Sequence, residues 1–253
     1  MQIHQFTCRD DNFGVLIHDP ATGACAAIDA PDENAMRKAL AQTGWRLSHI
    51  LVTHKHYDHI EAVLPLQQDF GCAVIAPKGA RGSVPAVDLY VGEGDTVEIG
   101  SLHATIWETP GHCADHILYH FADEAVAFAG DVLFALGCGR VFDGAYEDMW
   151  RSLERVAGLP DQTRVYFGHE YTLANAKFAL SVDPDNAALR RRFAEVVEVR
   201  ARGEATCPTT IGQEKAANPF LQASNPAMKA RLGMAGQSDA AVFRELRERK
   251  NRF

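Results

Sequence analysis

Short apolar runs separated by turn residues dominate the first 170 positions of this 253-residue chain. The runs at 13–18, 25–29, 72–76 and 103–107 have Gly, Pro or Asp between several of them, which is typical of strands. Helical patterns interrupt these runs, the first of them starting at Pro31-Asp32-Glu33. Hairpins and strand–helix–strand units are therefore mixed, and we expect a layered α+β structure.

Helical patterns replace the strands beyond residue 170. Leu189, Phe193 and Val196 recur at helical spacing, and Ser238 precedes the final helix as a typical N-cap. The predicted domains are residues 1–170, which carry the sheets, and residues 171–253, which form a C-terminal helical domain.

Four residues with metal-binding side chains follow one apolar run in the segment 50–60. They are His54, His56, Asp58 and His59. Residues two apart in an extended segment share a side, so the first two His can point the same way, while the helix that follows turns the other two in a new direction. A single His in such a place is usually structural, but four crowded ionisable groups are costly unless a cation neutralises them. The segment predicts a metal site, and nitrogen and oxygen ligands without thiolate are typical of an open catalytic one.

Three later strands end in residues of the same kind. His112, Asp131 and His169 each stand after a short apolar run and directly after a Gly, which lets the backbone turn tightly. An isolated Gly-His or Gly-Asp would be an ordinary turn, but strand ends can converge on one edge of a layered structure. With the segment 50–60 they make five His and two Asp, a set that suits two ions sharing a carboxylate.

The composition restricts the partners. Hydrophobic residues make up 47% and charged residues 23%, as in an ordinary folded protein, and the net charge of -8 disfavours a nucleic-acid or membrane-surface binder. No apolar stretch approaches the ~20 residues of a membrane span. The six Cys lack Cys-x-x-Cys spacing and no secretory segment precedes the first strand, so we expect buried free thiols in a cytoplasmic protein. We expect no nucleic-acid or membrane partner, and a monomer or weak oligomer.

The metal-ligand motifs resemble those of the metallo-β-lactamase superfamily. They are Thr53-His-Lys-His-Tyr-Asp-His59, Thr109-Pro-Gly-His112, Gly130-Asp131 and Gly168-His169. The resemblance implies a four-layer αββα sandwich with the site at one edge. It also implies one ion on His54, His56 and His112, a second ion on Asp58, His59 and His169, and a bridge between them by Asp131.

Further motifs resemble glyoxalase II, the family of hydroxyacylglutathione hydrolases. They are Asp11-Asn-Phe13, Gly137-Cys-Gly-Arg140, Gly168-His-Glu-Tyr171, Asn218-Pro-Phe-Leu221 and Leu246-Arg-Glu-Arg-Lys250. The resemblance implies a binuclear thioesterase that converts S-(2-hydroxyacyl)glutathione, such as S-D-lactoylglutathione, to glutathione and D-lactate. Asp58 and Asp131 would be catalytic, with two divalent ions, Zn first and Fe or Mn as alternatives. Glutathione would be bound by Arg140, Tyr171, Arg247 and Lys250.

Four positions depart from the glyoxalase II pattern. The family usually has Lys at Arg140, Tyr at Phe142, Arg at Gln222 and Gly at Asp115. Arg140 keeps the charge but changes its geometry, and Phe142 lacks a hydroxyl that could bind the thiol carrier. The departures therefore concern glutathione recognition more than hydrolysis.

Two other functions compete with the thioesterase. One is a glutathione persulfide dioxygenase of the same superfamily with a single iron, which the basic chain end disfavours, because residues 244–253 hold five basic residues against two Glu. The other is a metal-dependent nuclease or a noncatalytic binding module. The acidic net charge, without an interleaved basic and aromatic patch, disfavours nucleic acid.

Overall fold

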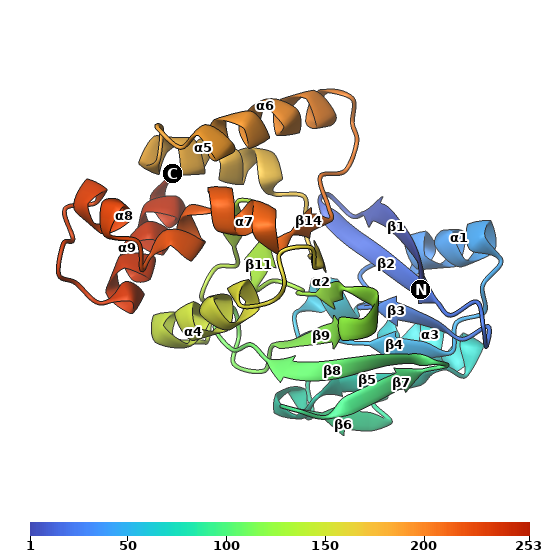
Figure 1. Ribbon diagram of the computed structural model, residues 1–253. Helices are drawn as coiled ribbons and strands as arrows, with labels where there is room; N and C mark the ends of the chain where they lie inside the picture. Colours follow the sequence, from blue (N-terminus) through green and yellow to red (C-terminus); the bar gives the residue numbers. More distant parts are fainter. The chain divides into compact units, whose positions relative to one another are not determined.

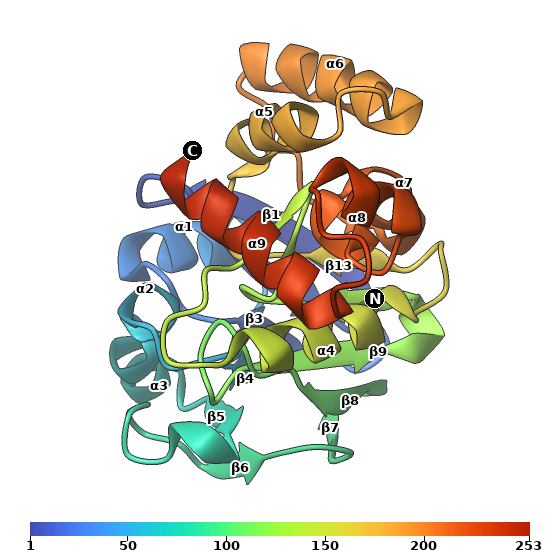
Figure 2. The ribbon, with the colours of Figure 1, turned by 90° about the vertical axis from the view of Figure 1, so that its left-hand side faces the viewer.

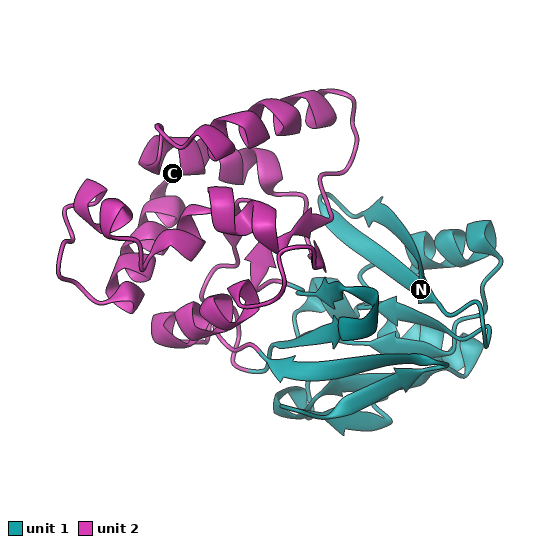
Figure 3. Ribbon diagram, viewed as in Figure 1, with its two compact units in different colours: residues 1–108, 115–130 teal, residues 109–114, 131–253 magenta.

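The computed structural model describes all residues from 1 to 253. The chain forms two compact units, shown in Figure 3: unit 1 comprises residues 1–108 and 115–130, and unit 2 comprises residues 109–114 and 131–253. The short segment 109–114 therefore belongs to unit 2, although residues on both sides of it belong to unit 1. Three predicted metal ligands, His112, Asp131 and His169, consequently lie in unit 2.

Unit 1 contains two β-sheets. The first has the order β1-β2-β3-β4-β5-β6 and consists of β1 (Gln2–Cys8), β2 (Asn12–His18), β3 (Cys25–Ile28), β4 (His49–Leu51), β5 (Ala73–Pro77) and β6 (Leu89–Val91). Neighbours from β1 to β3 pair antiparallel, and neighbours from β3 to β6 pair parallel. The strands β7 (Thr96–Ile99), β8 (Leu102–Glu108), β9 (Ile117–Phe121) and β10 (Val126–Phe128) pair antiparallel in the order β10-β9-β8-β7. The predicted mixture of hairpins and strand–helix–strand units is confirmed.

Helices α1 (Glu33–Thr43) and α3 (Val63–Phe70) pack on the first sheet (Figure 1). Met36 of α1 and Leu66 of α3 lie in one buried cluster with Ile50 and Val74 of the sheet, because each helix turns an apolar stripe toward it. The second sheet meets the first through β9, whose buried Tyr119 hydroxyl donates a hydrogen bond to the carbonyl of Val52 at 2.8 Å. Unit 1 therefore has successive layers of helix, sheet and sheet.

The helix after the metal-binding segment differs from the sequence expectation. The sequence predicts one helix from about residue 60 to 69, but the structure has α2 (Tyr57–Ile60) and α3, separated at residues 61 and 62. Pro65 explains the interruption, because a proline ring clashes with the carbonyl four residues earlier and has no N–H to donate. Pro65 is tolerated in the first turn of α3, and Gly71 ends that helix in the left-handed conformation that glycine adopts without strain.

Unit 2 is mainly helical, as Figures 1 and 2 show. Its helices are α4 (Tyr146–Ala157), α5 (Thr172–Val182), α6 (Ala187–Ala201), α7 (Ile211–Ala217), α8 (Pro226–Arg231) and α9 (Asp239–Arg252), with a short turn η3 (Pro219–Gln222). Its strands form two short antiparallel pairs, β11 (Leu133–Phe134) with β12 (Gly137–Cys138) and β13 (Arg164–Tyr166) with β14 (Thr209–Thr210). The predicted N-cap is confirmed, because the Ser238 side chain accepts a hydrogen bond from the N–H of Ala241.

The compact units do not coincide with the predicted domains. The elements from β11 to β13 precede residue 170 but belong to unit 2. The units describe packing, so the division after residue 170 stays a prediction. All six Cys are free and buried, as expected, and no helix combines the length and apolar character needed to cross a membrane.

Candidate metal centre

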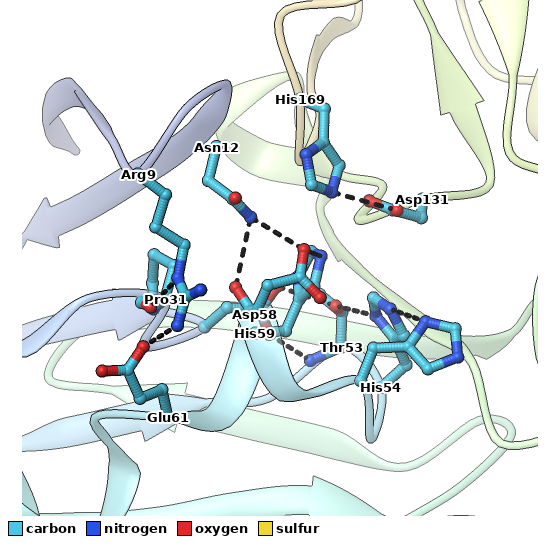
Figure 4. Close-up of polar contacts among 12 residues, drawn as sticks. Arg9, Asn12, Pro31, Thr53, His54, Asp58, His59, Glu61, Asp131 and His169 are labelled. Carbon is cyan, nitrogen blue, oxygen red and sulfur yellow. Dashed lines mark hydrogen bonds and ion pairs between the residues drawn. The ribbon is translucent and has the colours of Figure 1, made fainter.

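The predicted ligands of unit 1 form two pairs at the end of β4 (Figure 4). His54 and His56 lie side by side, with 3.1 Å between Nε2 of the first and Nδ1 of the second. The turn of α2 brings Nε2 of His59 to 3.7 Å from Oδ2 of Asp58. His54 and His59 are buried. The alternation of an extended segment and the turn of a helix produce these pairs, as the spacing predicts.

Asp29, which the sequence analysis did not select, holds this segment in place. Its carboxylate accepts hydrogen bonds from the N–H of Thr53 at 2.7 Å and from the Thr53 hydroxyl at 2.8 Å. Its Oδ2 also lies 2.7 Å from Nδ1 of His59. Ligand atoms of Asp29, His54 and His59 lie within 4.8 Å of one another, and all three residues are buried. A carboxylate on Nδ1 fixes the ring orientation and leaves Nε2 to bind a metal, so the arrangement fits a metal site.

Asn12 holds the side chain and the main chain of Asp58 by hydrogen bonds. The buried Asn12 side chain donates from Nδ2 to the Asp58 carboxylate at 3.1 Å and to the Asp58 carbonyl at 3.2 Å (Figure 4). The amide can satisfy one carboxylate oxygen and leave the other available. A local signal points to each residue: Asp29 directly follows the short apolar strand β3, and Asn12 stands in the motif Asp11-Asn-Phe13.

The predicted ligands of unit 2 gather around one carboxylate oxygen. Oδ2 of Asp131 lies 3.6 Å from Nε2 of His112 and 3.3 Å from Nε2 of His169, and all three side chains are buried. Nδ1 of His112 lies 2.8 Å from the carbonyl oxygen of Arg140, so this nitrogen must carry the proton and donate it. In the neutral ring, Nε2 of His112 then keeps its lone pair. A carboxylate oxygen close to two imidazole nitrogens is a donor arrangement that fits divalent cations.

Glycine is required beside Asp131 for steric reasons. Gly130 has a φ of 47°, and an added Cβ would lie 2.6 Å from Nε2 of His116 and 2.8 Å from the hydroxyl oxygen of Thr53. A Cβ on Gly139 would lie 2.0 Å from the carbonyl oxygen of Asp131. Neither position can therefore accept a side chain without displacing its neighbours.

The four residues predicted to bind glutathione all lie in unit 2, and three of them are cations. The Arg247 side chain is buried, donates from Nη1 to the carbonyl of Cys138 at 2.9 Å and lies over the ring of Phe220. Lys250 donates to the carbonyl of Ala174 at 2.9 Å. Burial, followed by repulsion from Arg247 and Arg140, lowers the pKa of Lys250 to about 8.

No carboxylate forms an ion pair with Arg140, Arg247 or Lys250. Three cations without an acidic partner create a region of positive potential in a protein whose net charge is negative. Such a region could bind an anionic ligand. Tyr171 is 38% exposed, and its ring stacks on that of His169 with the centroids 4.8 Å apart. Phe142, which departs from the glyoxalase II pattern, is 63% exposed with its ring centroid 5.3 Å from that of His112.

A cavity of about 490 Å³ in unit 2 is lined by the turn before α6 and by α7, η3 and α8, and it includes none of the predicted site residues. Arg231 at its wall pairs with Asp183 and Asp185, and Lys215 pairs with Asp161. Because its charged groups already neutralise one another, the cavity offers no chemistry comparable to that of the His and Asp clusters.

Comparison with known proteins identifies the class and then the family. Residues 14–169 match the model of the metallo-beta-lactamase superfamily, and residues 170–253 match that of the hydroxyacylglutathione hydrolase C-terminus. A hydroxyacylglutathione hydrolase from Methylobacterium nodulans is 54% identical over 253 residues, which cover 100% of this chain and 99% of the relative. The fold is thus that of a metallo-beta-lactamase enzyme with a helical C-terminal domain, and its His and Asp clusters indicate divalent metal ions. The chain belongs to the hydroxyacylglutathione hydrolase family.

Two solved structures are similar over most of the chain. The crystal structure of ETHE1 from Myxococcus xanthus is 28% identical with a TM-score of 0.71, covering 99% of this chain and 92% of that one. The crystal structure of TTHA1623 in a di-iron-bound form is 25% identical with a TM-score of 0.60, covering 86% of this chain and 99% of that one. The predicted α+β class, the metallo-β-lactamase fold and the enzyme assignment are confirmed.

Proposed function

We propose that the chain hydrolyses the thioester of S-(2-hydroxyacyl)glutathione, such as S-D-lactoylglutathione, to glutathione and D-lactate. Full-length similarity to hydroxyacylglutathione hydrolases and the C-terminal family match support this substrate. The glutathione persulfide dioxygenase is less well supported, because the ETHE1 structure is 28% identical whereas the Methylobacterium nodulans relative is 54% identical. The enzyme would act in the cytoplasm as a monomer or weak oligomer.

The proposed metal centre holds two divalent ions. His54, His56 and His112 would hold one, Asp58, His59 and His169 the other, and Asp131 would contact both. The observation that carries this proposal is the position of Asp131 Oδ2 between Nε2 of His112 and Nε2 of His169. The similar TTHA1623 structure, which is a di-iron-bound form, supports the same number. Zinc is the proposed metal, with iron or manganese as alternatives, because nitrogen and carboxylate donors accept all three.

The protein's own groups have separate tasks in this reaction. Bound divalent ions would supply Lewis acidity and lower the pKa of water toward neutrality. Asp29 and the Arg140 carbonyl hold the rings of His59 and His112 with one nitrogen available to the metal. Asp58 and Asp131 contribute negative charge to the centre and are the proposed catalytic carboxylates. The leaving thiol has a pKa of about 8.5, so its thiolate can leave without a dedicated acid.

The cationic cluster would bind the substrate. Arg140 and Lys250 would attract the carboxylates of glutathione, with Arg247 adding to the positive potential from its buried position. The exposed edge of Tyr171, stacked on His169, would place its hydroxyl beside the thiol carrier. Phe142 presents an apolar ring near His112, so this chain would hold the carrier with one hydroxyl fewer than the family pattern.

Thiol release from S-D-lactoylglutathione by the purified full chain tests the proposal. We expect activity that a chelator abolishes and that added zinc restores, with two equivalents of metal by elemental analysis. Asp131→Asn should lower kcat/KM by roughly 10²–10³, since a lost metal contact removes several kcal/mol of transition-state stabilisation. His103→Ala, at an exposed His outside the centre, is the matched control.

Two results would contradict the proposal. One is a metal-loaded protein that is inert toward glutathione thioesters, and the other is an Asp131→Asn variant with unchanged activity. Oxygen uptake with glutathione persulfide, without thioester hydrolysis, would favour the dioxygenase instead.

A further inference from the structure

Asp115 contacts a residue that lies between two proposed metal ligands. Its Oδ2 accepts a hydrogen bond from the main-chain N–H of Lys55 at 3.0 Å. Its Oδ1 lies 3.2 Å from Nζ of the same Lys55, which is an ion pair. Both oxygens of one carboxylate therefore contact the residue that separates His54 from His56, although the two partners are 60 positions apart in sequence.

The surroundings fix the Asp115 carboxylate in this position. Its side chain is 2% exposed. Main-chain atoms reinforce the contact, because the N–H of Ile117 donates to the carbonyl of Thr53 at 2.9 Å. A Cβ added to Gly79 would lie 3.0 Å from Cα of Asp115, so the chain also packs closely on the other side. The carboxylate is therefore enclosed by protein, with Lys55 as its cationic partner.

We propose that Asp115 is a positioning residue of the metal centre. Its carboxylate fixes the peptide at Lys55, which keeps the ring nitrogens of His54 and His56 3.1 Å apart, where both could hold one cation. The proposal rests on the metal-binding role proposed above for these two His. Lys55 provides the N–H that is held, and its ammonium group neutralises the buried carboxylate.

The two His need such a constraint because a single residue, Lys55, separates them in the chain. A polypeptide leaving a strand end has free φ and ψ at each residue, and two ligands separated by one residue converge only if that residue's conformation is fixed. A hydrogen bond to an ionised acceptor is stronger than one to a neutral acceptor and is further protected by burial. Asp115 supplies this constraint from the turn that precedes β9.

Two variants separate geometry from charge. Asp115→Asn keeps a carbonyl oxygen at the same reach but removes the charge, whereas Asp115→Glu keeps the charge and moves it by one methylene. Zinc dissociation constants of the full chain would be measured by competition with a chromophoric chelator, and stoichiometry by elemental analysis. Asp88→Glu is the matched control, because Asp88 of the same unit also accepts a main-chain hydrogen bond, from Val74 at 2.8 Å.

If Asp115 acts by position, the zinc dissociation constant of Asp115→Asn should lie within about fivefold of the wild-type value. The small loss would reflect the weaker hydrogen bond to a neutral acceptor. Asp115→Glu should weaken the binding of one of the two zinc ions by about tenfold or more, because a group that orients a metal ligand has been displaced. Lys55→Met, which keeps the held N–H, should resemble Asp115→Asn. Circular dichroism of the metal-free proteins checks that each variant is folded.

The opposite order, with Asp115→Glu near the wild type and Asp115→Asn weakened, would replace the positioning role by a purely electrostatic one. Unchanged zinc binding in both variants would overturn the proposal while leaving the two-metal centre intact. A wild-type chain that binds no zinc would overturn the metal centre and the positioning role together. If Asp115→Glu does not fold, Asp115→Ala replaces it in the test. Wild-type zinc affinity in Asp115→Ala would contradict the proposal.

Discussion

Asp29 and His59 are joined by a short contact, 2.7 Å between Oδ2 and Nδ1, across 30 positions of sequence. Asp29 has a φ of 56°, which is unusual for a residue with a side chain, and it is buried. A left-handed backbone at an aspartate costs free energy, so this conformation persists because the surrounding hydrogen bonds require it. The pair thus links a strained strand end to a proposed metal ligand.

Asp29→Asn should therefore weaken metal binding. The amide would bring an N–H₂ group toward the donors of His59 and Thr53, so the imidazole would lose its fixed orientation. We expect zinc affinity to fall by roughly 10–100-fold, with the fold retained. Asp88→Asn, at another aspartate of unit 1 that accepts a main-chain hydrogen bond, should bind zinc normally. Equal zinc affinity in Asp29→Asn and wild type would show that His59 needs no such support.

Substrate binding should depend on the charge of Lys250. Because the pKa of Lys250 is lowered to about 8, the amine is charged at neutral pH and loses its proton as pH rises through 8. The KM for S-D-lactoylglutathione should then rise between pH 7 and pH 9, while kcat changes less. A partly exposed ion pair contributes at most about 1 kcal/mol, so the increase should be up to about fivefold.

Lys250→Met is the matching variant. It should show the raised KM already at pH 7 and no further rise attributable to this group at pH 9. Arg252→Met, in the same last turn of α9, should keep the wild-type profile, because Arg252 pairs with Glu248 instead. A pH-dependent KM that persists unchanged in Lys250→Met would assign the effect to another group.

Gly130→Ala should destabilise unit 1 more than the same substitution at Gly23, a glycine with positive φ in open space. Gly23 has a φ of 78° and open space where a Cβ would lie, whereas Gly130 has a φ of 47° and an added Cβ there would clash with His116 and Thr53. Gly23→Ala should lower the free energy of unfolding by about 1–2 kcal/mol through backbone strain alone. Gly130→Ala should lower it by a further 1–3 kcal/mol or so through overpacking. Urea unfolding measures both, and equal losses would mean that the site relaxes around the added methyl group.

Glu214 should give unit 2 a pH-dependent stability. Its fully buried carboxyl accepts hydrogen bonds from Thr209, Leu136 and Asn218, and burial raises its pKa above 4.5 despite these bonds. Above pH 4.5 the folded chain then keeps a proton that the unfolded chain loses. The free energy of unfolding therefore falls as pH rises from 4.5 to the raised pKa of the folded chain, by up to about 1.4 kcal/mol per pH unit.

Comparison of wild type with Glu214→Gln isolates this contribution. Urea unfolding of the metal-free proteins at pH 4.5 and pH 7 should show a larger loss of stability in the wild type, because glutamine does not titrate. The same change in both proteins would mean that Glu214 stays ionised when folded.

Local signals predicted several parts of the structure. Asp32 caps α1 by accepting from the N–H of Ala35, and the first two His after β4 lie on one side, as their spacing requires. The exception was the single helix expected after residue 60, where Pro65 separates two helices. The proline was visible in the sequence, and its clash with a carbonyl four residues earlier is itself a local effect.

The amino-acid order alone determined which residue types stand at strand ends, since alternation, capping and turn formation act over a few positions. Tertiary structure decided which groups support them: Asn12 reaches Asp58 across 46 positions, Asp29 reaches Thr53 across 24, and Asp115 reaches Lys55 across 60. It also decided that Arg247 is buried while Tyr171 is partly exposed. Hydrogen-bond partners so distant in sequence are brought together by the packing of strands and turns, which no local pattern specifies.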